Sequence, residues 1–389
     1  MRVLVAHNYY RQRGGEDQVF EDEVDLLRRN GHDVETFVRH NHDFSGLQTI
    51  SVAAGTVWNR SAARAIEEQA RAMSAEVVHF HNWLPQISMA AFASAHRSGA
   101  AVVQTIHNYR YTCASGVLYR DGEICEACLG KAVGTPAVKY GCYRDSRVAT
   151  IPLVTALGIH RAKGTTAKYL DAVIMLTEFA QTKLSDSGLP TDRMYIKPNF
   201  VSPDPGEGSG AGGYVAFVGR LIDNKGIEVL LDAWSTMPTA PTLRIAGAGP
   251  MEVAVQASAD ALENVEYLGR IDGSAVSEFL GHATASVVPS LNYEGFPKTV
   301  VESYAVGTPV IASRIGSLID IVTDGETAFH FEPGDTDGLR AIVGDPATWA
   351  SLGAMRPIVR GRFESELSAD ANIGRLVEIY DAAIRHRHA

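Results

Sequence analysis

Short runs of apolar and β-branched residues alternate along the whole chain with longer stretches in which apolar positions recur at helical spacing. Such runs are typical of buried strands, and the stretches between them are typical of amphipathic helices. Helices are predicted at Glu16–Arg29, Ile227–Ser235 and Ala275–Leu280. Strands are predicted at Arg2–Ala6, Asp33–Val38, Glu76–His81, Ala101–His107, Ala172–Leu176, Met194–Lys197, Tyr214–Val218, Leu243–Ala246, Val265–Leu268, Ala285–Val288, Pro309–Ala312 and Ala328–Phe331. This alternation predicts an α/β fold with parallel sheets covered on both faces.

One segment of the chain has the composition of a linker. Ser202–Gly213 is dense in proline, glycine and serine, which predicts a turn-rich connection before a new sheet begins. We therefore expect two Rossmann-like, doubly wound domains, 1–200 and 201–368. They should face each other across a cleft, with ligand sites at the switch points of their sheets. The tail 369–389 is predicted to form one last amphipathic helix.

The composition is that of a soluble globular protein, since 46% of the 389 residues are hydrophobic and 21% are charged. The net charge of -10 argues against a general nucleic-acid binder. It leaves room for a nucleotide, because a diphosphate needs only a few local cations. We therefore expect no nucleic-acid partner.

Two apolar segments bear on membranes. Met1–Ala6 is too short for a signal peptide. Val148–Ile159, interrupted by Pro152, is too short to span a bilayer. It predicts a buried helix or loop, with a lipid-facing or acceptor-facing element as the alternative. We expect a cytoplasmic protein and leave open a peripheral contact with the inner face of a membrane.

Two glutamates bracket a turn and a helix start between the strands predicted at Ala285–Val288 and Pro309–Ala312. Pro297 suits the first turn of a helix, whose free amides would point back toward the loop and attract an anion. Glu294 would lie in that loop and Glu302 about two turns into the helix. Two carboxylates beside an anion site suit a nucleotide-sugar, and two solvated surface glutamates are the alternative.

A pair of cations follows the strand predicted at Tyr214–Val218. Arg220 leaves the carboxyl end of that strand, where open α/β sheets bind ligands, and Lys225 lies at the mouth of the next helix. Together they could hold a diphosphate and neutralise the charge that grows as it departs. Such residues are commonly just solvated, so the prediction of a donor site depends on their occurrence together with Glu294 and Glu302.

The motifs of the second half occur in a recognisable order: Gly219-Arg220 with Lys225-Gly226, Ile245-Ala246-Gly247-Ala248-Gly249-Pro250, Pro289-Ser290, Glu294 with Glu302, and Gly307-Thr308-Pro309-Val310-Ile311-Ala312-Ser313. This combination resembles the retaining glycosyltransferases of family 4, which have the GT-B fold. Arg13-Gly14-Gly15-Glu16 and Gly31-His32-Asp33-Val34 extend the resemblance to the first half. A subgroup of bacterial polysaccharide-assembly enzymes has a segment similar to His107-Asn108-Tyr109-Arg110-Tyr111-Thr112-Cys113.

The resemblance implies a hexosyl or glycosyl transferase that moves a sugar from a UDP-, GDP-, ADP- or dTDP-sugar to an acceptor hydroxyl with retention. The acceptor would be a saccharide, a lipid-linked saccharide or a small molecule, bound by the first domain. The donor would be bound by the second domain, and closure of the cleft would assemble the site. The last helix would cross back onto the first domain. The base, the sugar, the acceptor and the oligomeric state are not determined by the sequence.

Roles follow from the resemblance residue by residue. Arg220 and Lys225 would grip the donor diphosphate, Glu294 would hydrogen-bond the transferred sugar, and Glu302 would accept hydrogen bonds from the ribose. The remaining donor contacts would come from Gly14, Gly15, Arg270, Gly295, Phe296, Pro297 and Thr299. The loop at Arg270 would meet the base through backbone groups, and Gly15 would let the backbone approach the phosphates. Gly14 and Gly15 are equally compatible with a plain turn.

His107 ends a predicted strand and completes the expected catalytic set with Arg220, Lys225 and Glu294. Family members often carry His-Asp at this place, with the histidine near the donor sugar, whereas this chain has Asn108 after His107. A histidine at a strand end is also often a purely structural residue. His79 and His81 share one face of the preceding strand. They either line the cleft or pack in the core, and we place His81 near the acceptor region.

No metal is expected in the reaction, because Arg220, Lys225 and a helix N-terminus would stabilise the leaving phosphate. No Asp-x-Asp run is placed like a metal clamp. Glu294 and Glu302 are not read as a glycosidase pair, which needs two carboxyls about 5 Å apart across the bond. The alternatives left open are a sugar-nucleotide epimerase, a phosphorylase, and a non-catalytic saccharide or nucleotide binder.

All four cysteines lie in a predicted insertion, 108–147, at Cys113, Cys125, Cys128 and Cys142. Their spacing around a central Cys-x2-Cys can close a tetrahedral site for structural zinc. Disulfides are less expected in a reducing cytoplasm. Four unliganded thiols in an irregular insertion are the alternative.

Overall fold

The computed structural model describes residues 1–42 and 47–389. The chain divides into two compact units by its contacts, and each has its own parallel sheet. The first unit consists of Met1–Leu118, Cys125–Pro198 and Asn372–Ala389, and the second of Tyr119–Ile124 and Asn199–Ala371.

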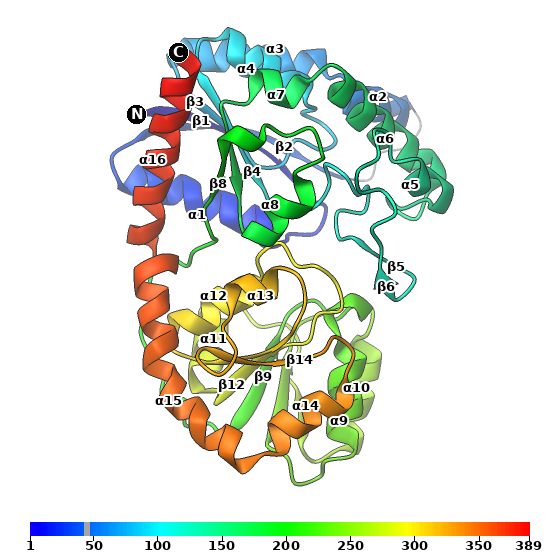
Figure 1. The fold of residues 1–389 in the computed structure, drawn as a ribbon, viewed down its shortest axis with the longest axis vertical. Coiled ribbons are helices and arrows are strands. Elements are labelled where there is room, and N and C mark those ends of the chain that lie inside the picture. The colour runs from blue at the N-terminus through cyan, green and yellow to red at the C-terminus, as the bar shows by residue number, and fades with distance from the viewer. Residues whose placement is uncertain (43–46) are drawn as a thin grey trace. The chain divides into compact units, whose positions relative to one another are not determined.

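The described residues of the first unit form a six-stranded parallel sheet with the order β2-β1-β3-β4-β7-β8 (Figure 1). Its strands are β1 (Arg2–Tyr9), β2 (Asp33–His40), β3 (Val77–Phe80), β4 (Ala101–Ile106), β7 (Ala172–Met175) and β8 (Met194–Ile196). The order reverses between β1 and β3, so the carboxyl ends of these two strands form a switch point.

Helices cover this sheet, and α16 lies beside α1 against it (Figure 1). Phe20 and Leu27 of α1 share one hydrophobic core with Leu376 and Tyr380 of α16. The helices of this part of the chain are α1 (Gly15–Arg29), α2 (Leu47–Val57), α3 (Arg60–Ala72), α4 (Ala90–Arg97), α5 (Thr135–Tyr140), α6 (Arg147–Ala162), α7 (Thr165–Tyr169), α8 (Glu178–Leu184), the 3-10 turn η1 (Thr191–Arg193) and α16 (Ala369–His388).

The second unit also has a six-stranded parallel sheet in its described residues, with the order β11-β10-β9-β12-β13-β14. Its strands are β9 (Tyr214–Val218), β10 (Thr242–Ala246), β11 (Val265–Tyr267), β12 (Ala285–Val288), β13 (Val310–Ser313) and β14 (Ala328–Phe331). This is the doubly wound order of dinucleotide-binding domains, and β9 and β12 flank its switch point.

The helices of the second unit are η2 (Asp223–Lys225), α9 (Ile227–Ser235), α10 (Glu252–Ala261), α11 (Gly273–His282), α12 (Lys298–Ala305), α13 (Ser317–Ile321), α14 (Thr336–Gly344), α15 (Pro346–Arg362) and η3 (Phe363–Leu367). The α/β fold with two parallel sheets is therefore confirmed. Every predicted strand is present, with ends that differ by a few residues.

One feature differs from expectation. The strands β5 (Tyr119–Arg120) and β6 (Glu123–Ile124) form a short antiparallel hairpin that the apolar pattern does not indicate, because so short a ladder has no periodicity. The segment Ser202–Gly213 has bends and turns before β9, as its composition predicts, and it packs against its own unit. The amides of Gly208 and Gly210 donate to the carbonyls of Val306 and Gly281. A Cβ on Gly208 would lie 2.3 Å from backbone atoms of Gly281, so glycine is needed there for packing.

The apolar stretch around Pro152 forms α6, a surface helix with one buried face. Leu153 and Val154 are buried, whereas Val148 and Ile151 are 79% and 49% exposed. Among the helices that the structure describes, none is both long and apolar enough to cross a bilayer.

Candidate active site

The second unit brings Lys225 and Glu294 together at its switch point. Nζ of Lys225 lies 2.5 Å from Oε1 of Glu294. The contact depends on Gly226, which has a φ of +71° and packs against the end of β12. A Cβ there would lie 1.9 Å from the carbonyl oxygen of Pro289. The glycine thus lets the loop after β9 touch the loop after β12, and this carries Lys225 to Glu294.

Glu294 is held from several sides. Its side chain is almost fully buried, and its residue is 9% exposed. The hydroxyl of Ser290 donates to Oε1 of Glu294 at 2.6 Å, and the hydroxyl of Ser317 donates to its main-chain carbonyl at 2.7 Å. A carboxylate that accepts from a hydroxyl and faces an ammonium is held in one orientation for binding.

Arg220 lies on a loop fixed by close backbone contacts. The amide of Gly219 donates to the carbonyl of Ala246, and that of Leu221 donates to Ala248. A Cβ on Gly247 would lie 1.9 Å from the carbonyl oxygen of Gly219, which explains the glycine in this motif. The side chain of Arg220 is exposed, and it makes no hydrogen bond or ion pair with another described residue. Arg270, after β11, is exposed as well.

The helix after Glu294 begins one residue later than predicted. Pro297 is the N-cap of α12, with a φ of -65°, and the helix starts at Lys298. Glu302 therefore lies little more than one turn into the helix and not two turns. The hydroxyl of Thr299 donates to the carbonyl of Val218 at 3.1 Å, which ties the first turn of α12 to the end of β9. The carbonyl of Phe296 accepts from the side-chain amide of Asn199.

In the first unit, Asp17 organises the loop that carries Gly14 and Gly15. Its carboxylate accepts from the amide of Gly14 at 2.9 Å, and His7 Nε2 lies 2.8 Å away on the other side. Both Asp17 and His7 are fully buried. A Cβ on Gly14 or Gly15 would meet no protein atom within 4 Å, so packing inside the unit does not account for these two glycines.

His107 follows the carboxyl end of β4 and is partly exposed, one strand away from His81. Its Nε2 lies 3.0 Å from Nδ1 of His81. The next residue, Asn108, reaches the carboxylate of Glu16 at 3.3 Å and the hydroxyl of Tyr10 at 3.4 Å. An aspartate at position 108 would face the Glu16 carboxylate, so the amide avoids a repulsion between like charges.

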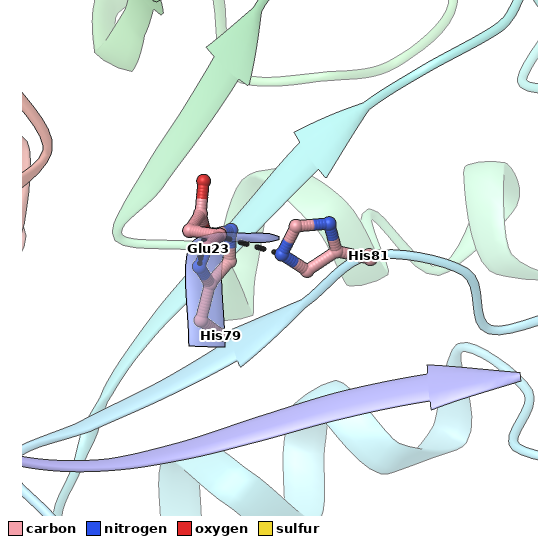
Figure 2. A group of neighbouring side chains, drawn as sticks. All are labelled: Glu23, His79 and His81. Carbon is pink, nitrogen blue, oxygen red and sulfur yellow. Dashed lines mark hydrogen bonds and ion pairs between the residues drawn. The ribbon is translucent and has the colours of Figure 1, made fainter. Parts of the chain in front are cut away.

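Behind His81 lies a buried polar network. Glu23 Oε1 is 3.0 Å from His79 Nδ1 and 3.1 Å from His81 Nε2, and Glu23 Oε2 is 2.8 Å from Lys197 Nζ. Figure 2 draws Glu23 with the two histidines. His79 also contacts the hydroxyls of Thr105 and Tyr380. Burial alone would raise the pKa of Glu23, but Lys197 and the two histidines outweigh burial and hold that pKa well below its usual range.

Three ligand atoms of Glu23, His79 and His81 lie within 4.8 Å of one another, a spacing that a metal ion could use. The geometry favours an ion-pair network instead. Lys197 already supplies the positive charge at Glu23, and both nitrogens of His79 already have partners. A divalent cation would have to compete with a buried ammonium group.

The zinc expectation for the four cysteines is not supported. None of the four is in a disulfide, and within the described part of the chain no three of their sulfur atoms lie within 4.8 Å of one another. Burial raises the pKa of the Cys128 thiol, and the neighbouring thiols raise it further, against a backbone hydrogen bond that lowers it.

Acidification is expected to destabilise the first unit. Burial lowers the pKa of His81 from 6.5 to about 4, against the opposing effect of the Glu23 carboxylate. Between these values the unfolded chain binds a proton at His81 and the folded unit does not. The free energy of unfolding therefore falls as the pH drops from about 6.5 to about 4. The loss is on the order of 3 kcal/mol, because one pKa unit corresponds to about 1.4 kcal/mol.

Unfolding midpoints measured at about pH 7 and about pH 5 check this expectation. The difference between the two midpoints should be smaller in His81→Gln, which removes the titrating ring, than in the unsubstituted protein. An equal pH dependence in both proteins would contradict the assignment to His81.

Sequence reasoning missed the side chains that hold the candidate site residues in place. Ser290 and Ser317 orient Glu294, and Asp17 orients Gly14. The pair Pro289-Ser290 comes directly after the predicted strand Ala285–Val288, and a polar residue at such a strand end could have been recognised as a site residue. No sequence signal indicated that Lys197 pairs with Glu23, because Lys197 ends an apolar strand far from Glu23 in the chain.

Solved structures identify the fold. Sucrose-phosphate synthase from Thermosynechococcus elongatus is similar over 98% of both chains, with a TM-score of 0.67 and 18% identity. Anabaena HepE in complex with UDP is similar over 98% of this chain and 100% of its own, with a TM-score of 0.64 and 14% identity. The two parallel-sheet units therefore form the GT-B fold of glycosyltransferases.

Sequence comparison names the family. The family model described as "Glycosyl transferase 4-like domain" matches residues 14–199, and the one described as "Glycosyl transferases group 1" matches residues 212–345. Together these matches cover most of the chain, and the chain belongs to this family of glycosyltransferases.

Curated relatives match in part. Glycogen synthase of Mycobacterium tuberculosis is 34% identical over 144 residues, which are 34% of this chain and 34% of that protein. The chain spans about a third to a half of the length of the first curated relatives it matches.

Proposed function

We propose that the chain is a retaining glycosyltransferase that moves a sugar from a nucleoside-diphosphate sugar to an acceptor hydroxyl without a metal ion. The observation that carries the proposal is the pairing of Lys225 with Glu294 at the switch point of the second sheet, 2.5 Å apart. It puts a cation and a fixed carboxylate where open α/β sheets bind ligands. The cation would pair with a diphosphate, and the carboxylate would accept a hydrogen bond from a sugar hydroxyl.

The donor diphosphate would be held by positive charge from three sources. Arg220 is exposed after β9, and Lys225 lies on the neighbouring turn η2. The first amides of α12 are the third source. As the bond from the anomeric carbon to the phosphate oxygen breaks, charge builds on the leaving diphosphate. Preformed cations and amides stabilise that charge, so this chain's own groups can supply the positive charge in place of a metal ion.

The carboxylates have separate tasks in this proposal. Glu294 accepts a hydrogen bond from a hydroxyl of the transferred sugar, and Glu302 accepts from the ribose hydroxyls. Gly295, Phe296, Pro297 and Thr299 offer backbone groups around the start of α12, and the loop that carries Arg270 after β11 would meet the base through backbone groups. The Thr299 hydroxyl is committed to Val218, so Thr299 would contact the donor through its main chain.

The first unit would supply the remaining contacts. Gly14 and Gly15 leave open space where a Cβ would lie, which supports a close approach of the donor phosphates. His107 follows a strand end beside a hollow lined by Glu16, His81 and Arg110, which supports a role next to the transferred sugar.

A donor screen tests the proposal. The protein is incubated with UDP-, GDP-, ADP- and dTDP-sugars, and nucleotide release and thermal shift are measured with EDTA present. We expect one nucleotide class to raise the unfolding midpoint and to be hydrolysed or transferred, and we expect Glu294→Ala to abolish turnover. Absence of binding by every sugar nucleotide, or unchanged transfer by Glu294→Ala, would overturn it. Product stereochemistry by NMR decides between retention and inversion.

We further propose that the acceptor is a saccharide carried on lipid in polysaccharide assembly and that α6 contacts the inner face of the membrane. Val148 and Ile151 are exposed on α6, and Arg144 and Arg147 lie exposed beside them. Exposed apolar side chains flanked by cations suit an anionic lipid surface. The donor screen does not depend on this second proposal.

Cosedimentation with vesicles that contain phosphatidylglycerol tests the membrane contact. We expect binding that falls several-fold in the double variant Val148→Ser with Ile151→Ser. Val253→Ser removes a side chain that is 83% exposed on α10 and serves as the matched control. Equal sedimentation of all three proteins would exclude α6 as the contact.

A further inference from the structure

A line of contacting side chains runs through the interior of the first unit and ends at His107. Lys197 pairs with Glu23, Glu23 Oε1 lies 3.1 Å from Nε2 of His81, and Nδ1 of His81 lies 3.0 Å from Nε2 of His107. Figure 2 shows Glu23 beside the rings of His79 and His81. Lys197, Glu23 and His81 are at most 2% exposed. The line therefore lies out of contact with water until it reaches His107.

The positions of the protons in this line follow from counting donors and acceptors. An ionised Glu23 can only accept, so Nε2 of His81 must carry a proton and donate to it. A neutral imidazole has one N–H, which leaves Nδ1 of His81 as an acceptor. Nε2 of His107 must then carry a proton and donate to His81. The remaining nitrogen of His107, Nδ1, is left with a bare lone pair.

The charges required by this count are the ones that the surroundings favour. Lys197 and the histidines, acting against burial, keep the pKa of Glu23 well below its usual range, so Glu23 is ionised. Burial lowers the pKa of His81 to about 4, despite Glu23. Burial, together with His81, also holds the pKa of His107 well below its usual range. Both rings are therefore neutral near pH 7.

The bare nitrogen of His107 is in a position to meet a substrate. His107, His81, Glu16, Asn108 and Arg110 line a hollow that is partly open to solvent. Apart from the contact of Nε2 with His81, no described residue makes a hydrogen bond with the His107 ring. Nδ1 is thus the ring atom that remains to bind a ligand.

We propose that Glu23 and His81 are positioning residues that fix His107 as the tautomer with a bare Nδ1, so that His107 accepts a hydrogen bond from a substrate hydroxyl. This inference rests on the proposed glycosyltransferase function. A carboxylate that orients a histidine through its far nitrogen is a general device for setting a tautomer, and here a second histidine is inserted in the line. In this tautomer His107 recognises an O–H group and does not donate to a phosphate.

The test reads the tautomer directly by 15N NMR of histidine-labelled protein, which needs no activity. We expect His107 to be protonated at Nε2 and bare at Nδ1. His81→Phe removes the acceptor that His107 needs, so its two tautomers should mix, and turnover should fall about tenfold or more. His81→Gln should rescue both readouts, because its amide can donate to Glu23 and its carbonyl can accept from His107.

His79→Phe is the matched control, because His79 shares the Glu23 contact and the strand of His81 but does not touch His107. The His79→Phe variant should be less stable than the unsubstituted protein, while its His107 tautomer and its turnover stay unchanged. Protonation of His107 at Nδ1, or a tautomer unaffected by His81→Phe, would overturn the inference. If the protein transfers no sugar, the proposed function fails while the NMR result still decides the tautomer.

Discussion

Replacing Lys225 with alanine is expected to lower kcat/KM for sugar transfer by about 10²- to 10³-fold, the loss typical of removing one preorganised group that stabilises developing charge. The ammonium of Lys225 lies at the switch point of the second sheet, where it would face the leaving diphosphate. Initial rates with the donor found in the screen measure the effect. Arg340→Ala removes a cation from an ion pair on α14 and is the charge-matched control.

Loss of stability has to be separated from loss of chemistry in this variant. Without Lys225 the nearly buried Glu294 carboxylate loses its ammonium partner, and breaking such a pair costs about 3–5 kcal/mol when burial is complete. The double variant Lys225→Ala with Glu294→Gln removes both charges. We expect it to recover much of the unfolding midpoint and none of the transfer. Recovery of transfer would mean that the pair is only structural.

Replacing Glu302 with glutamine is expected to raise KM for the donor by about 10- to 100-fold with kcat nearly unchanged. The ribose is remote from the breaking bond, so its contacts bind the ground state and the transition state alike. A hydrogen bond to a charged group contributes about 1.5–3 kcal/mol, which sets this range. Glu294→Gln should behave in the opposite way and lower kcat, since Glu294 is proposed to hold the reacting sugar.

A donor analogue that lacks a ribose hydroxyl makes the second prediction specific. The unsubstituted protein should lose affinity for the deoxyribose donor, whereas Glu302→Gln should bind the normal and the deoxy donor alike. Glu326→Gln changes an exposed carboxylate of the same unit and should leave KM as it was. An additive loss from the two changes would show that Glu302 does not contact the ribose.

Much of the fold was available from the sequence because the sheets are parallel and buried. A strand covered on both faces is a short apolar run, and this local pattern marks the fully buried strands β3, β4, β7, β12 and β13. The hairpin at Tyr119–Ile124 was not available, since a ladder of two residues on each side has no pattern to read. The start of α12 was misplaced by one residue because a proline suits both the N-cap and the first turn.

The candidate site divides in the same way. The sequence by itself determined which segments carry Arg220, Lys225, Glu294 and His107, because each follows a recognisable strand and ligand sites collect at strand ends. Only the tertiary structure decided which of these groups touch. Lys225 meets Glu294 across 69 positions of the chain, and Glu23 meets both His81 and Lys197. Pairings between distant segments are set by strand order and close backbone packing, and the local periodicity of the sequence predicts neither of them.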